Sequence, residues 1–174
     1  MIRSRSSPAR ETISLQRFNN NVANGNGGGI YMEDLSPRSK RGFPGSPRSS
    51  LDIYENSIIS SNTGEDGGGI ACAGDVGIEV FDSQIGQNEA RSDGGGVFLT
   101  DGCLFELNDS GPFQGVLLNE AAGFGGGIYA VENSEVRLRG GDNEGFPAVI
   151  AANSATNGAG IALRSSSVLD ARDS

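Results

Sequence analysis

The sequence predicts an all-β protein: a right-handed parallel β-helix with three short strands per coil and about five coils. Three observations support this fold class. A run of glycines followed by an aliphatic residue occurs five times, an asparagine lies five or six residues before each run, and short apolar segments alternate with a period of two. An imperfect repeat of this kind is typical of a solenoid in which equivalent residues of successive coils stack.

The glycine runs set the first element of each repeat. Glycine permits positive φ and close backbone approach, so each run predicts a corner of the coil. The aliphatic residues that follow are 40, 27, 31 and 33 residues apart. We expect them to form a core aliphatic stack that consists of Ile30, Ile70, Val97, Ile128 and Ile161.

The asparagines predict a second stack. Each follows an apolar residue by three positions and precedes an alanine or glycine by two. A stacked side-chain amide can hydrogen-bond to the next one, and asparagine tolerates the left-handed conformation that a turn needs. The expected structural ladder consists of Asn21, Asn62, Asn88, Asn119 and Asn153.

The other half of each repeat predicts a strand with one buried and one wet face. In Ile78-Glu79-Val80, Phe105-Glu106-Leu107 and Val136-Arg137-Leu138 the outer residues are apolar and the middle residue is charged. Leu51 and Ile53 are the equivalents in an earlier repeat. No segment repeats apolar residues with helical spacing, so we expect no helices.

The chain divides into two parts. Residues 1–17 are expected to be irregular or a partial cap, and residues 18–174 form the repeats. Extra residues near 35–50, 108–115 and 140–147 predict loops, because they contain most of the prolines. Insertions of this kind often lie on the binding face of a repeat protein, so these loops are a candidate interaction surface. The alternative is that they are tolerated surface insertions.

Charge limits the classes of partner. The chain has 174 residues and a net charge of −9. Residues 1–50 hold eight basic and three acidic residues, whereas the rest of the chain holds five basic and 19 acidic residues. The acidic body should repel nucleic acid. The basic residues Arg38, Lys40, Arg41 and Arg48 predict a solvated loop or, alternatively, an anion-binding patch. We recognise no signal peptide, membrane span or anchor in the sequence.

The sequence offers little for catalysis. It contains no histidine, which excludes Ser–His and Cys–His nucleophiles. Glu79 and Glu106 occupy equivalent positions in adjacent repeats, with Arg137 next, and paired carboxylates can hydrolyse glycosides. Charge balance on a wet face is the favoured interpretation. Asp66 and Asp93 precede glycine runs and are interpreted as solvated turn acids rather than Ca²⁺ ligands. We therefore predict no catalytic residue, no metal and no cofactor.

The two cysteines lie at different positions of the repeat. Cys72 aligns with Leu99 of the next repeat, whereas Cys103 aligns with Val76. Cys72 is expected to point inward as a small hydrophobic residue. Because the two cysteines do not align with each other, no disulfide between them is expected, and their spacing does not match a metal site.

These repeats resemble the polymorphic outer membrane protein repeats and the related Gly-Gly-Gly-Ile-Tyr β-helix proteins. That family pairs a Gly-Gly-x-aliphatic motif with a Phe-x-x-Asn motif, which here is Phe18-Asn19-Asn20-Asn21 and recurs in relaxed form before the other four asparagines. Gly-Gly-Gly-Ile-Tyr occurs at 27–31 and 125–129, and Tyr31 and Tyr129 should face outward. The resemblance implies a pectate-lyase-like shape and display outside the cell, often as an adhesin or autotransporter passenger.

The expected function is a non-catalytic scaffold. As the resemblance implies, it would be a segment of a surface-exposed or secreted protein, for adhesion or for binding a host or cell-surface glycan or protein. The alternative is a fragment of a pectate-lyase-like polysaccharide lyase or glycoside hydrolase. Because a repeat array leaves two open ends, we also expect end-to-end self-association.

Overall fold

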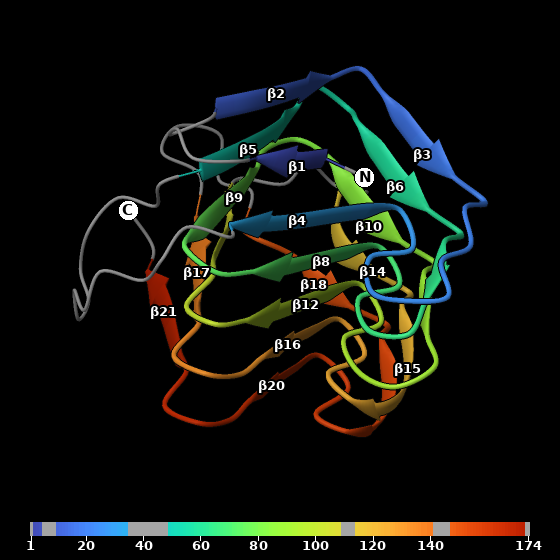
Figure 1. Cartoon of the computed structure of the whole chain (residues 1–174), viewed down its shortest axis with the longest axis vertical. Coiled ribbons are helices and arrows are strands. Elements are labelled where there is room, and N and C mark those ends of the chain that lie inside the picture. The colour runs from blue at the N-terminus through green and yellow to red at the C-terminus, as the bar shows by residue number, and fades with distance from the viewer. Residues whose placement is uncertain (1, 5–9, 35–48, 109–113, 141–146, 173–174) are drawn as a thin grey trace.

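The computed structural model describes residues 2–4, 10–34, 49–108, 114–140 and 147–172. Within these ranges it contains strands and turns and no helix, and every pair of neighbouring strands is parallel. The strands stack in four sheets that enclose one core (Figure 1). The predicted class, an all-β parallel β-helix, is therefore confirmed.

Sheets A and B contain six strands each. Sheet A consists of β1 (Ile2–Ser4), β4 (Ile30–Asp34), β8 (Ile70–Ala73), β12 (Val97–Thr100), β16 (Ile128–Ala130) and β20 (Ile161–Leu163). Sheet B consists of β2 (Arg10–Ser14), β5 (Ser49–Tyr54), β9 (Val76–Val80), β13 (Leu104–Leu107), β17 (Glu135–Arg139) and β21 (Val168–Arg172). The chain passes from a strand of sheet A directly to the next strand of sheet B.

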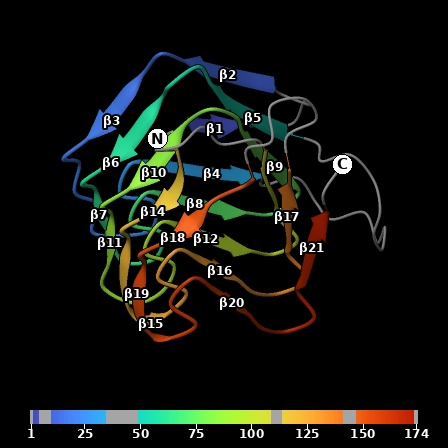
Figure 2. The same cartoon turned by 180° about the vertical axis from the view of Figure 1, so that it is seen from behind.

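Sheets C and D complete each coil and are visible from behind in Figure 2. Sheet C consists of β3 (Arg17–Asn19), β6 (Ile58–Ser60), β10 (Gln84–Gly86), β14 (Gly115–Leu117) and β18 (Ile150–Ala151). Sheet D consists of β7 (Thr63–Gly64), β11 (Glu89–Ala90), β15 (Glu120–Phe124) and β19 (Ser154–Asn157). A full coil thus has four strands where three were expected, because a short strand follows the asparagine.

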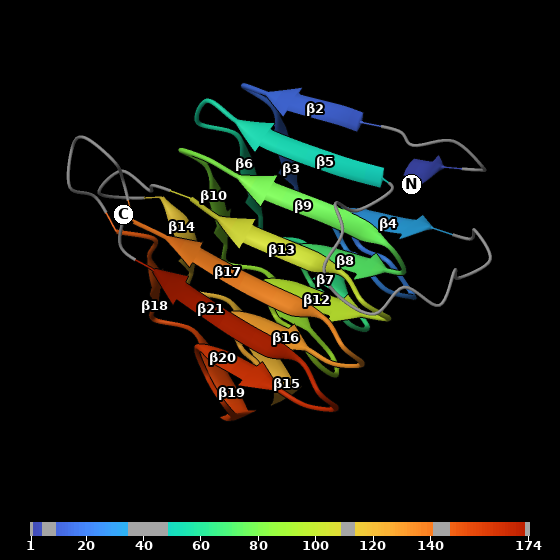
Figure 3. The same cartoon turned by 90° about the vertical axis from the view of Figure 1, so that its left-hand side faces the viewer.

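The coils are right-handed. In Figure 1 the strands of sheet A run to the left and the coils descend from the N-terminal to the C-terminal end. In Figure 3, where the left-hand side of that view faces the reader, the strands of sheet B run away from sheet A. A chain that turns in this sense as it descends has the handedness that parallel crossover connections almost always adopt.

The aliphatic stack lies inside the coil. Register pairs Ile30 with Ile70, Ile70 with Val97, Val97 with Ile128 and Ile128 with Ile161. The first four side chains are 4%, 0%, 0% and 0% exposed, and Ile161 packs on the core while partly buried. Full burial of such a side chain stabilises the fold by about 1.5–3 kcal/mol.

The predicted register of the second strand also holds. Leu51, Ile78, Phe105, Val136 and Leu169 form one inward column of sheet B. All but Leu169 are completely buried, whereas Leu169 is 41% exposed. Leu163 of the last strand of sheet A is likewise 37% exposed. The last described coil therefore has interior-type residues that no further coil covers.

In the first four runs, the first and second glycines serve different purposes. Gly67 has a φ of +64°, which an L side chain rarely adopts. Gly68 instead faces its neighbouring coil, because a Cβ built there would lie 2.4 Å from the carbonyl oxygen of Glu89. The run therefore combines a left-handed corner with a backbone contact too close for a methyl group.

The N-terminal segment is more regular than expected. Residues 1–17 were predicted to be irregular or a partial cap, yet they contain β1 and β2. Strand β2 pairs with β5 over five residues, and Ile13 points into the core at 8% exposure. A single inward apolar residue is too weak a pattern to predict a strand from sequence, but it suffices to add one to an existing sheet edge.

Candidate functional site

The asparagines form a continuous column between sheets C and D. In each step, the backbone N–H and the Nδ2 of one asparagine both donate to the Oδ1 of the next, at 2.9–3.0 Å. The column runs through Asn21, Asn62, Asn88, Asn119 and Asn153. These side chains hold the corner together and are structural.

Each inner amide also bridges to the preceding coil. Nδ2 of Asn88 donates to the carbonyl of Ile59 at 3.0 Å, and Nδ2 of Asn119 donates to that of Ile85 at 3.0 Å. Asn88 is 1% exposed, so its polar atoms have little access to water. The left-handed residue is not the asparagine but its predecessor. Gln87 and Leu118, for example, both have a φ of 57°.

The candidate contact surface is the outer face of sheet B. Its central column contains the three residues that were expected to balance charge, and further residues of neighbouring strands continue the column on both sides. Register stacks Thr12, Asp52, Glu79, Glu106, Arg137 and Asp170. We call this set the sheet B charge column. It brings together the three residues singled out from the sequence, Glu79, Glu106 and Arg137.

Ion pairs neutralise three of the four acids in this column, namely Asp52, Glu106 and Asp170. Arg10 forms an ion pair with Asp52, which is 2% exposed. Arg137 contacts Glu135 at 2.7 Å and Glu106 at 3.5 Å. The hydrogen bond from Arg137 to Glu135 raises the pKa of the guanidinium. The column is therefore largely an ion-pair network, as the charge-balance interpretation requires.

Glu79 differs from its neighbours. Partial burial is the largest cause that raises the pKa of its carboxyl, and the negative charges of Glu106 and Asp52 raise it further. A carboxyl with a raised pKa beside an ionised carboxylate is the arrangement that glycosidases use for a general acid and a nucleophile. The alternative enzymatic interpretation therefore concerns this pair.

Aromatic rings lie beside the charge column. Tyr54 follows Asp52 by two residues and Phe81 follows Glu79 by two, so both rings are on the outer face of sheet B. Their centroids are 4.9 Å apart and the planes differ by 21°. Stacked, half-buried rings next to charged groups form a mixed surface that can contact sugars or peptides.

The predicted loops adjoin sheet B. Residues 35–48 precede β5, residues 109–113 follow β13, and residues 141–146 follow β17. Most of each insertion, with the basic residues Arg38, Lys40, Arg41 and Arg48, lies outside the described residues. The described part of the chain begins again at Ser49, which already belongs to β5. In sequence, the first insertion thus connects to the start of a sheet B strand, and the other two connect to the ends of such strands.

The turn acids bind backbone amides. Oδ1 of Asp66 accepts a hydrogen bond from the N–H of Asp93 at 3.1 Å, and Oδ1 of Asp93 accepts one from the N–H of Phe124 at 2.7 Å. Burial raises the pKa of Asp66. The described residues contain no group of three acidic or sulfur side chains that is arranged for a metal ion. The acids therefore link successive coils at the turn before the glycine run.

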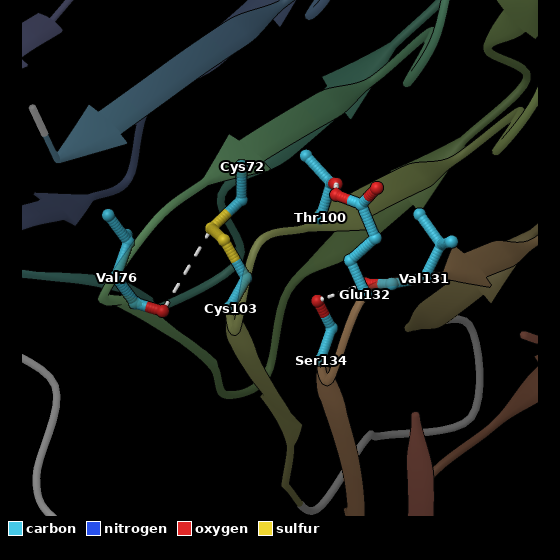
Figure 4. Close-up of a disulfide and its surroundings, with 7 residues drawn as sticks. All are labelled: Cys72, Val76, Thr100, Cys103, Val131, Glu132 and Ser134. Carbon is cyan, nitrogen blue, oxygen red and sulfur yellow. Dashed lines mark hydrogen bonds between the residues drawn. A yellow bond between two sulfur atoms is a disulfide. The ribbon is translucent and has the colours of Figure 1, made fainter. Parts of the chain in front are cut away.

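The cysteines correct the sequence analysis. Cys72 and Cys103 form a disulfide with a Cα–Cα distance of 6.3 Å (Figure 4), although none was expected. The register prediction itself is correct, because Cys72 pairs with Leu99. The error came from considering only neighbours within one column. At the corner between sheets A and B, inward side chains from two columns and two adjacent coils meet.

Tyr129 also differs from the simplest expectation. It lies on the outer side of sheet A but is only 5% exposed. Phe98 and Phe124 flank its ring, with centroids 5.8 and 5.7 Å away, and Arg164 lies over Phe124 at 5.0 Å. This cluster shields the ring, which leaves Tyr129 little surface for a ligand.

A serine stack was missed. The N–H of Ser57 donates to Oγ of Ser83 at 3.2 Å, and both residues are almost completely buried, at the corner between sheets B and C. Each serine lies two residues before the apolar residue that precedes the asparagine, namely Ile59 and Ile85. That spacing was available in the sequence as a signal.

The fold and its corners define a parallel β-helix repeat protein. Residues 17–33 match the model of the Chlamydia polymorphic membrane protein repeat. This stretch contains β3 and most of β4, with the Phe18–Asn21 motif and the first glycine run. The match supports a repeat similar to that of the polymorphic membrane proteins. No curated protein and no solved structure matches the chain. Across the described residues, no helix has the length and apolarity to cross a membrane.

Proposed function

We propose that this chain is a non-catalytic β-helix segment of a surface-exposed or secreted protein and that it serves adhesion. The outer face of sheet B would contact a glycan or a protein of another cell. The observation that carries this proposal is the combination of a polymorphic membrane protein repeat match with a single face that holds a charge column and an aromatic pair.

The disulfide supports an exported protein. Disulfides persist in oxidising surroundings such as the periplasm, the cell surface and the extracellular space, and they are rare in the cytosol. Cys72 and Cys103 are the two cysteines of the chain, and both are in the bond. This argument from chemistry is independent of the family match.

Binding is tested with the whole chain on an array of neutral and acidic glycans and on fixed cells. The key variant is Phe81→Ala, which removes half of the aromatic pair on sheet B. The matched control is Phe98→Ala, which removes a half-buried ring from the outer side of sheet A. We expect Phe81→Ala to weaken binding up to about tenfold and Phe98→Ala to leave it within twofold, since an aromatic contact contributes about 0.5–1.5 kcal/mol and about 1.4 kcal/mol corresponds to tenfold. Equal loss in both variants would contradict a sheet B contact.

A second candidate is a pectate-lyase-like polysaccharide lyase or glycoside hydrolase. The raised pKa of Glu79 beside Glu106 favours it. Turnover is measured on pectin, polygalacturonate and neutral β-glucans, with and without Ca²⁺. The adhesion proposal predicts no product. Product formation that is abolished by both Glu79→Gln and Glu106→Gln would replace it with the enzymatic function.

A further inference from the structure

The disulfide closes one complete coil into a covalent ring. Cys72 lies at the end of β8 and Cys103 lies directly before β13, with a sequence separation of 31. The chain between them contains β9, β10, β11 and β12, which is one strand from each of the four sheets. The ring therefore has the circumference of one turn of the solenoid.

The repeats themselves define this register weakly. In the native structure β8 pairs with β12 and β9 pairs with β13. A register that skips one repeat would pair β8 with β16 and β9 with β17. Glycine would again lie on glycine, asparagine on asparagine, and Ile70 would meet Ile128 instead of Val97. The paired interior residues hardly distinguish the two arrangements. The skipped one leaves a coil with the completely buried Leu99 and Phe105 outside the core, so it is a trap during folding and not a competing native state.

Charge on the outer face favours the wrong arrangement. Native register places Glu79 beside Glu106, which is a repulsive pair across neighbouring strands. The skipped register would place Glu79 beside Arg137, so one attractive pair replaces the native pair of Glu106 and Arg137 while the repulsion between the two glutamates is removed. It would also place Ala130 opposite Cys72 and leave Cys103 in the looped-out repeat. The native register holds the two sulfur atoms together at the corner between sheets A and B, whereas the skipped register gives Cys103 no fixed position there.

We propose that the Cys72–Cys103 disulfide is a register lock, which excludes the skipped pairing of coils during folding in an oxidising compartment. The bond forms by exchange with a small disulfide such as oxidised glutathione. One cysteine thiolate attacks that disulfide and releases one thiol. The second cysteine thiolate then displaces the other thiol and completes the protein disulfide. The chain loses two electrons and two protons, and the small disulfide is reduced to two thiols.

Burial makes the lock persistent. Cys72 is 1% exposed and Cys103 is completely buried. The sulfur of Cys72 lies 3.9 Å from the carbonyl oxygen of Val76 inside the corner (Figure 4). A reducing thiol needs access to a sulfur atom, so the coils must separate before the bond can be attacked. The native solenoid thus protects the bond that specified its register.

The test is refolding from urea of the full chain, with the disulfide intact or reduced by dithiothreitol. Rates and yields of refolding are compared at urea concentrations where the intact and reduced chains have the same free energy of unfolding. A remaining difference then reflects how the coils pair and not how stable the native state is. We expect the intact chain to refold at least about tenfold faster, because its loop is already closed, and to give one monomeric product. The reduced chain should give a fraction of non-native species. Equal rates and yields would overturn the proposal.

Glu79→Gln provides a matched variant. The substitution removes the repulsion by Glu106 in the native register and the attraction to Arg137 in the skipped register. It breaks no native ion pair within the described residues, because Glu79 forms none there. In the reduced chain this substitution should recover most of the native yield. An unchanged non-native fraction would overturn the charge argument. Separately, alkylation after dithiothreitol treatment should show disulfide reduction at least about 100-fold slower in buffer than in denaturing urea, and similar rates would overturn protection by burial.

Discussion

Replacing Asn88 by leucine tests the asparagine column in its interior. The Asn88 side chain takes part in four hydrogen bonds, all at 3.0 Å. It donates to Ile59 and Asn119, and it accepts from the backbone and side chain of Asn62. Leucine has a similar size and none of these groups. Asn119 keeps the hydrogen bond from the backbone N–H of residue 88, at 3.0 Å.

Three polar groups then lose their partners in the buried corner: the N–H and one amide hydrogen of Asn62, and the carbonyl of Ile59. At about 1–1.5 kcal/mol for each buried group left without a partner, the free energy of unfolding should fall by about 3–4.5 kcal/mol. The marginal stability of proteins makes this a large fraction of the total, which is typically about 5–15 kcal/mol.

The assay is urea denaturation followed by far-UV circular dichroism. Asn24→Leu is the control, because Asn24 is exposed and lies outside the column. It should change the unfolding free energy by less than about 0.5 kcal/mol. At the exposed end of the column, Asn21→Leu should cost less than about 1.5 kcal/mol, because that amide donates only to Asn62. A cost below about 0.5 kcal/mol for Asn88→Leu would refute the reasoning.

Four further changes have expected outcomes. Leu118→Gly should raise the unfolding free energy by about 1 kcal/mol, because Leu118 is 53% exposed and has a φ of 57°; chemical denaturation checks this. Folding raises the pKa of Glu79, so ionising this carboxyl costs stability as pH rises through its folded pKa. Glu79→Gln should therefore raise the free energy of unfolding at pH 7. Below the unfolded pKa of glutamate, about 4, the substitution should have no effect. Reducing the Cys72–Cys103 bond should lower stability by about 3–4 kcal/mol for a loop of 31 residues, measured by urea unfolding with and without reductant. Leu169→Glu should reduce any self-association seen by analytical ultracentrifugation, because Leu169 is 41% exposed on the last coil.

The coil and its register were predictable because each repeat carries several signals at fixed offsets. The aliphatic residue after the glycines and the asparagine before them both recur. If the repeats were aligned wrongly on one of these features, the other would no longer match. The strands of sheet D were not predictable in the same way. Strand β11, for example, has two residues, Glu89 and Ala90, which is too short for a period of two to appear.

The errors at the candidate site have a common origin. Alignment compares residues in one column, whereas the disulfide joins two columns at a corner. The backbone conformation of the turn shows the same limit. Asparagine was expected to tolerate positive φ, yet Leu118 adopts it while Asn119 provides the hydrogen bonds. Residue preference thus identified the turn but assigned its strained position to the wrong neighbour.

The second glycine of the first four runs lies too close to the next coil for any side chain, whereas outward positions of sheet B have room for one. At Gly126, an added Cβ would lie 2.3 Å from the carbonyl oxygen of Ser154, so even alanine would push two coils apart. Outward positions of sheet B have no such contact, and Glu106 and Arg137 occupy equivalent positions on neighbouring strands. Substitution can therefore change the chemistry of this face at intervals of about 4.8 Å while the backbone remains unchanged. A scaffold with this property accepts different side chains on this face with little cost to folding.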